Sequence, residues 1–198
     1  MTREQYLNKM TIELNNRVFK QNGFELNIPK IKISCGYPSK GGTARKRKTL
    51  GECYPDVLNG LNEIFINPCL SDSIAVGDTL THELIHAYDN CIDGHGKKFR
   101  KIAIAVGLEG KMTSTHAGEK LTETLQEIVK DIGEYPHEEL KYENTKKQTT
   151  RMIKVYCTEC ELEGSNNISR TSRKNIDENG KPLHLICRHH GDTMIASV

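Results

Sequence analysis

The sequence lacks three features that would assign a protein to a class at once. It has no apolar run of about eighteen residues, which excludes an ordinary transmembrane helix. It has little excess charge, with 28 basic and 26 acidic residues, so no overall field directs it to nucleic acid or to a membrane. Its first residues, MTREQYLNKM, lack the apolar core of a signal peptide. We therefore expect a soluble, intracellular protein with no membrane partner.

Disulfides are not expected either, because an intracellular compartment is reducing. The 7 cysteines are better explained as metal ligands or as small buried residues. Four of them stand singly along the chain, which favours core positions: Cys35, Cys53, Cys69 and Cys91.

The other three cysteines belong to a metal-ligand pattern. Cys157 and Cys160 form a CxxC pair, and Cys187 begins a Cys-Arg-His-His segment that ends at His190. Two such knuckles are typical of a structural zinc site. His190 repeats the two-residue gap of the first knuckle, whereas His189 would require a tighter loop. The predicted ligands of this zinc ion are therefore Cys157, Cys160, Cys187 and His190.

The segment THELIHAYDNCIDGHGKKF, residues 81–99, concentrates the side chains of a hydrolytic zinc site. On a helix, His82 and His86 project from one face and can bind one ion, with Glu83 beside them. Glycines on both sides of His95 allow a sharp turn that brings this residue back toward the ion. Three neutral imidazoles leave zinc one open position for water. Glu83 can take a proton from that water and pass it to a leaving amine.

Four nearby residues leave alternatives open. Cys91 could complete the coordination shell and make the site structural. Glu123 could replace His95 as the third ligand, although the glycines beside His95 favour the histidine. His116 suits either a hydrogen-bond donor to a transition state or an exposed residue at a helix entry. Tyr88 is expected in the core.

Patterning predicts an α+β fold with two units. Alternating apolar residues predict strands at residues 31–35, 49–54 and 63–67, which would form a three-stranded antiparallel or mixed sheet. Residues at helical spacing predict helices at 2–20, 79–90 with Asp78 as its N-cap, 99–106 and 121–132. A charged and polar stretch at 137–150 predicts a linker between a catalytic unit, 1–136, and a small unit, 151–198, whose few large apolar residues make it dependent on bound metal.

Two groups of basic residues are candidates for nucleic-acid contact. The first lies in a glycine-containing segment between two predicted strands, which suits either a solvated hairpin tip or a phosphate-binding loop. The second lies in the small C-terminal unit, where a solvated turn is as consistent as nucleic-acid contact. The candidates are Arg45, Lys46, Arg47 and Lys48 in the first group, and Arg170, Arg173 and Lys174 in the second.

Several segments together resemble the SprT-like (Spartan-type) zinc metallopeptidases, in particular small members from phages and viruses that end in a zinc ribbon. These segments are LGECYP, EIFINP, THELIHAYD, GHGKKF, GLEGKMTSTHAGE and QTTRMIKVYCTEC. The resemblance implies a zincin-like fold, with His82, His86 and His95 as zinc ligands and Glu83 as the catalytic residue. It also implies peptide-bond hydrolysis near DNA, because characterised relatives cut proteins crosslinked to DNA.

The sequence thus predicts a zinc-dependent endopeptidase with one catalytic and one structural zinc ion. Its expected partners are a protein or peptide substrate and DNA. The rival hypothesis is a non-proteolytic, nucleic-acid-binding or transcription-associated zinc protein on a zincin scaffold. Intact Glu83 argues against this rival.

Overall fold

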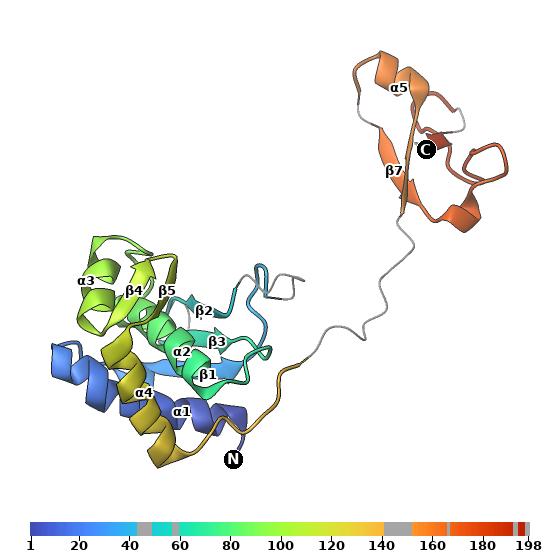
Figure 1. Ribbon diagram of the computed structural model, residues 1–198. Helices are drawn as coiled ribbons and strands as arrows, with labels where there is room; N and C mark the ends of the chain where they lie inside the picture. Colours follow the sequence, from blue (N-terminus) through green and yellow to red (C-terminus); the bar gives the residue numbers. More distant parts are fainter. Residues whose placement is uncertain (43–48, 57–59, 141–151, 166, 192–193, 197–198) are drawn as a thin grey trace. The chain divides into compact units, whose positions relative to one another are not determined.

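A computed structural model of the protein describes residues 1–42, 49–56, 60–140, 152–165, 167–191 and 194–196 (Figure 1). The chain divides into two compact units, Met1–Glu143 and Asn144–Val198. The division falls within residues 137–150, the range predicted as a linker. No helix in the described ranges is both long and apolar enough to cross a membrane.

The first unit is built on a mixed three-stranded sheet in the order β1-β3-β2. The strands are β1 (Ile31–Cys35), β2 (Gly51–Tyr54) and β3 (Asn62–Ile66). β3 pairs in parallel with β1 and antiparallel with β2. All three predicted strands are present, although the second begins at Gly51 and not at Thr49. Ile64 and Ile66 point into the core at alternate positions of β3, as its apolar pattern predicts.

Helix α1 (Arg3–Leu14) begins at the capping box that the sequence predicts between Thr2 and Gln5. It continues as a π-helical turn over Asn15–Phe19 and a 3-10 turn over Lys20–Asn22. Gly23 then ends it with a left-handed φ of 81°. Tyr6, Met10 and Leu14 are fully buried, so the four-residue spacing identified the inner face of this helix.

Helix α2 (Ser73–Tyr88) is longer than predicted, and its N-cap is Asp72. The Asp72 side chain accepts a hydrogen bond from Ala75 N at 2.8 Å, so the expectation that Asp78 is the N-cap is wrong. Asp78 lies inside the helix. Gly77, which interrupts the apolar pattern, faces α4: an added Cβ would lie 2.6 Å from Leu125 Cδ2. A glycine at this position therefore allows two helices to approach closely.

The rest of the first unit comprises α3 (Lys97–Ala105), β4 (Leu108–Lys111), β5 (Ser114–Ala117) and α4 (Glu119–Ile132). β4 and β5 form an antiparallel hairpin that the sequence analysis did not predict. In Figure 1 the helices α1, α2 and α4 of this unit lie close to the three-stranded sheet, and the core is formed by the buried residues of the helices and of β3. Its fully buried members include Leu7, Ile64, Leu80, Leu84, Leu125 and Ile128.

The second unit contains β6 (Ile153–Tyr156), the short helix α5 (Thr158–Leu162), β7 (Ile168–Thr171) and β8 (Ile195–Ala196). The strand order is β7-β6-β8, and both pairings are antiparallel. Half of its small buried cluster is cysteine: the members are Val155, Cys157, Cys160, Cys187, Met194 and Ala196. The two units together make a mixed fold of helices and small sheets, consistent with the predicted α+β class.

Candidate functional site

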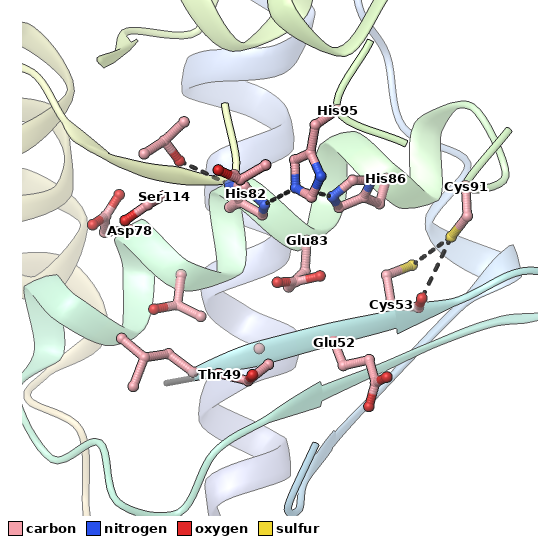
Figure 2. A pocket seen from close by; sticks show the side chains of 15 residues that line it. Thr49, Glu52, Cys53, Asp78, His82, Glu83, His86, Cys91, His95 and Ser114 are labelled. Atoms are coloured by element: carbon pink, nitrogen blue, oxygen red, sulfur yellow. Dashed lines mark hydrogen bonds between the residues drawn. The ribbon is translucent and has the colours of Figure 1, made fainter. Parts of the chain in front are cut away.

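A cavity of about 380 Å³ opens in the first unit between β2, α2 and the β4–β5 hairpin (Figure 2). Three histidines and Glu83 line one wall of it, and residues 49–53 line the opposite wall. Asp78, misplaced as a cap by the sequence analysis, also lines the cavity, and burial raises its pKa to about 6. No lysine or arginine is among the described lining residues.

The imidazoles of His82, His86 and His95 converge at this wall, as Figure 2 shows. His95 Nε2 lies 3.1 Å from His82 Nε2 and 3.3 Å from His86 Nε2. Ligand nitrogens about 2.0–2.1 Å from a tetrahedral zinc ion are separated by about 3.3–3.4 Å. The three nitrogens therefore have the spacing that one zinc ion requires, and they form one of two candidate metal-binding groups among the described residues.

Phe99 supports all three imidazoles from behind. Its ring centroid lies 4.9 Å from that of His82, 4.6 Å from that of His86 and 5.0 Å from that of His95. Phe99 is 1% exposed, so its position is set by core packing. Phe99, the aromatic residue of the GHGKKF segment, thus provides an apolar surface against which the three imidazoles pack.

The hairpin β4–β5 contributes a hydrogen bond to one of the histidines. Thr115 Oγ1 lies 2.8 Å from His82 Nδ1. With Nδ1 engaged, the Nε2 atom of His82 faces the other imidazoles, and a partner of this kind fixes both the tautomer and the ring orientation of a metal ligand. Thr115 is therefore a positioning residue for His82.

The protein environment keeps the histidines neutral. Burial, with the neighbouring His86 and His95, lowers the pKa of His82 to about 3. Burial and His95 lower the pKa of His86 to about 4, and burial lowers the pKa of His95. Neutral imidazoles are the form that binds metal, so the unprotonated nitrogens are available throughout the neutral range.

Glu83 follows His82 on α2 and is 6% exposed. Burial, with smaller effects from Cys91 and Glu52, raises its pKa to about 8. A carboxyl group with a proton affinity near neutrality can both accept and return a proton. Gly51 on β2 leaves the space for it: a Cβ on Gly51 would lie 2.7 Å from Glu83 Cγ and 2.7 Å from Glu83 Oε1.

The turn between α2 and α3 carries His95 and is braced from several sides. Asp93 Oδ2 accepts hydrogen bonds from Lys98 N at 2.7 Å and from Phe99 N at 3.2 Å, which satisfies two free amides at the start of α3. Gly94 has a left-handed φ of 54°, as the sequence predicted for a sharp turn. The turn therefore returns His95 to the face of α2.

Several alternatives are not supported by the geometry. Cys91 is not part of the histidine group, and its Sγ lies 3.5 Å from Cys53 Sγ. Glu123 is exposed on α4. His116 is exposed at the end of β5, shortly before α4 begins at Glu119, as the second of its alternatives predicted; its Nε2 lies 3.9 Å from Glu109 Oε2, and it is not among the described residues that line the cavity. Tyr88, expected in the core, is 37% exposed: it lies in the last turn of α2, where its ring packs edge-on against Phe24 and Lys98 Nζ lies 5.9 Å from the ring centroid.

The second unit holds the other candidate metal group, formed by Cys157, Cys160, Cys187 and His190. Cys160 Sγ lies 3.5 Å from Cys187 Sγ and 3.4 Å from His190 Nδ1. Tetrahedral zinc geometry gives about 3.8 Å between sulfurs and about 3.6 Å between sulfur and nitrogen, so this group also fits zinc. His190 Nε2 contacts Glu163 Oε1 at 3.2 Å, which orients the ring, whereas His189 is exposed and outside the group.

The predicted nucleic-acid contacts fall into two sets. Arg45, Lys46, Arg47 and Lys48 lie outside the described residues. Arg170 is exposed on β7, and Arg173 and Lys174 are exposed in a 3-10 turn over Arg173–Asn175.

Gly51 and Thr115 are site residues that were not predicted from the sequence. Both stand inside segments that carry the family resemblance, LGECYP and GLEGKMTSTHAGE. Their roles depend on contacts with α2, which is distant from both in the sequence. A glycine within a strand pattern does, however, signal a close approach of another group.

One open three-histidine group and one closed Cys₃His group together define a protein with two candidate zinc sites. The sequence profile of the SprT-like family matches residues 7–122, which is more than half of the 198 residues. The chain belongs to the SprT-like family, whose members have a zinc metallopeptidase-like domain. No curated protein and no solved structure matches the chain.

Proposed function

We propose that the protein is a zinc-dependent endopeptidase with a zincin-like catalytic unit. The observation that carries this proposal is the presence, in one cavity, of three neutral convergent imidazoles and a buried glutamate next to them in the sequence. A structural zinc site would have a fourth protein ligand, and Cys91, the residue considered for that position, is outside the histidine group, with its Sγ 3.5 Å from Cys53 Sγ. The open position of the histidine group therefore faces the cavity.

Each residue has a defined task in this proposal. His82, His86 and His95 would hold the ion, with Thr115 orienting His82 and Phe99 supporting the rings. Bound zinc would supply a Lewis acid that polarises a carbonyl group and acidifies water. Glu83 would take a proton on its carboxylate and deliver it to the leaving nitrogen of the peptide. Burial raises the pKa of Glu83 to about 8 in the metal-free protein, and the positive charge of bound zinc would favour the carboxylate that accepts the proton.

We infer that the second unit is a zinc ribbon. Its buried cluster is small, and three of its six members are cysteines of the four-ligand group, so bound metal would supply most of its folding energy. Three thiolates and one imidazole complete a tetrahedral shell and leave no open position, which is the arrangement of a structural site.

The outer face of the ribbon sheet fits single-stranded nucleic acid. Lys154 on β6 and Arg170 on β7 are cross-strand partners, so two cations are held side by side, which is unfavourable without an anion between them. Tyr156 follows on the same face, between Ile168 and Ile195. Cations beside an aromatic ring flanked by apolar residues provide phosphate contacts and a surface on which a base can stack.

A second basic segment, residues 45–48, lies outside the described residues, but the residue that follows it in the sequence, Thr49, is described. Asn67 is fully buried, and its Nδ2 donates to Gly42 O and Thr49 O, both at 2.9 Å. Thr49 itself lines the cavity. The four cations directly precede Thr49 in the sequence, which supports the proposal that the substrate is bound to DNA.

A protease assay separates this function from the rival, a nucleic-acid-binding protein that does not cleave. Casein and a DNA-bound basic protein would each be incubated with the zinc-loaded chain, with and without single-stranded DNA and a chelator. We expect cleavage that the chelator abolishes and that DNA increases for the DNA-bound substrate. Tight DNA binding without cleavage under any of these conditions would favour the rival.

A further inference from the structure

Two cysteines that belong to neither metal group are in contact with each other in the lining of the cavity. Cys53 is on β2 and Cys91 is in the turn after α2, and both line the cavity wall. Their Sγ atoms are 3.5 Å apart, and Cys91 Sγ is also 3.5 Å from Cys53 O (Figure 2). Both residues are partly exposed, so a small oxidant can reach them.

The backbone holds Cys91 in a conformation that side chains rarely adopt. Asn90 and Cys91 have φ values of 56° and 58°, in the left-handed region that favours glycine. Asn90 Oδ1 fixes this strained turn by accepting hydrogen bonds from Asp56 N at 2.7 Å and Asn62 Nδ2 at 2.8 Å. Cys91 N also donates to His86 O at 2.8 Å. The thiol of Cys91 is thus aimed at Cys53 by a braced turn in which glycine would be less strained.

We propose that Cys53 and Cys91 form a reversible disulfide when the protein meets hydrogen peroxide, and that this bond lowers the peptidase activity. The effect on activity rests on the proposed function, whereas formation of the bond does not.

The oxidation is balanced by peroxide alone. The Cys91 thiolate attacks one peroxide oxygen, which breaks the O–O bond, gives a sulfenic acid and releases hydroxide. The Cys53 sulfur then attacks the Cys91 sulfur and displaces the sulfenic hydroxyl, which leaves as water with the Cys53 proton. Two thiols are oxidised and one peroxide is reduced to two waters. The contact with Cys53 lowers the pKa of Cys91, which favours Cys91 as the attacking sulfur.

The bond would disturb Glu83 through β2. A disulfide requires an S–S distance of about 2.05 Å, so the sulfurs must approach each other from 3.5 Å. Gly51, two residues before Cys53 on β2, is packed closely against the Glu83 side chain, so a shift of β2 would displace Glu83. The turn that contains Cys91 leads to His95. A displacement of about 1 Å in a site can lower a rate by about 100-fold, so we expect the crosslinked protein to turn over at least about tenfold more slowly.

The experiment treats the full-length, zinc-loaded chain with hydrogen peroxide and maps its thiols by mass spectrometry after proteolysis. We expect a crosslinked peptide that contains Cys53 and Cys91, a fall in activity in proportion to its yield, and recovery of both with dithiothreitol. Zinc release is followed in parallel, because it would reveal oxidation of the ribbon cysteines.

Cys53→Ser and Cys91→Ser are the matched controls, and their activity should resist the same treatment. Absence of the Cys53–Cys91 peptide overturns the proposal, and so does an equal loss of activity in the two variants. A crosslink that leaves turnover unchanged overturns its regulatory part. If the reduced protein cleaves nothing, the proposed function fails, and the crosslink yield still decides whether the thiols pair.

Discussion

The close packing of Gly51 against Glu83 allows the proposed catalytic site to be tested by the substitution Gly51→Ala. The new Cβ would lie 2.7 Å from Glu83 Cγ and 2.8 Å from Thr79 Cγ2, whereas carbon atoms in contact are about 3.5–4.0 Å apart. Either β2 or the Glu83 side chain must therefore move by about 1 Å. We expect kcat to fall by about 10- to 100-fold and the zinc content to stay at the wild-type level, because the substitution contacts none of the three histidines.

Gly36→Ala is the matched control for this substitution. Its Cβ would lie 2.9 Å from Phe65 Cδ1 in the same sheet, so it introduces similar crowding away from Glu83. Both variants should lose about 1–3 kcal/mol of stability, measured by denaturant unfolding, but only Gly51→Ala should lose activity. Full activity in Gly51→Ala, or an equal loss in the control, would refute the reasoning.

Three further predictions concern the metal groups and Glu83. Thr115→Val should weaken zinc binding at His82 by about 10- to 100-fold, measured by chelator competition, whereas Thr113→Val on the same hairpin should leave it unchanged. In the metal-free chain, burial raises the pKa of Glu83 to about 8 from its usual 4.5, so the stability that depends on the protonated carboxyl group is complete below about pH 4.5 and is lost as the pH rises toward 8. Glu83→Gln should therefore stabilise the protein more as the pH rises, by up to about 3 kcal/mol at pH 7. A pH-independent difference between the free energies of unfolding, measured with denaturant, would contradict this. Cys160→Ser should release the ribbon zinc and expose residues 152–196 to proteolysis while casein cleavage persists, and an intact second unit without zinc would show that metal is not its core.

Most of the helices and strands of the first unit could be predicted from local periodicity in the sequence. The capping box at Thr2, the alternating residues of β1 and the four-residue spacing of His82 and His86 are short-range patterns, and each specifies one element without help from the rest of the chain. The predicted start of α2, at residue 79, was wrong because Gly77 interrupts the apolar pattern of the helix. A glycine is needed at position 77 because Leu125 of another helix lies close to it, and no local pattern reveals this contact.

The candidate site divides in the same way. The convergence of the three histidines follows from helical geometry plus a glycine-flanked turn, both readable along the sequence. The positions of Gly51 and Thr115 depend on which strand lies beside α2 and on the register of the β4–β5 hairpin. The contact between Cys53 and Cys91 likewise joins two segments separated by β3 and α2. Such contacts are set by tertiary packing, so patterns within one segment do not predict them.

Glu83 is proposed to perform the proton transfers of a zinc peptidase, and comparison of the wild type with Glu83→Gln tests this role directly. Both proteins would be matched for zinc content by elemental analysis, and their rates on casein and on a DNA-bound basic protein would then be measured. We expect equal zinc in both proteins and cleavage by the wild type alone. Cleavage by Glu83→Gln at the wild-type rate and with full zinc would contradict the account.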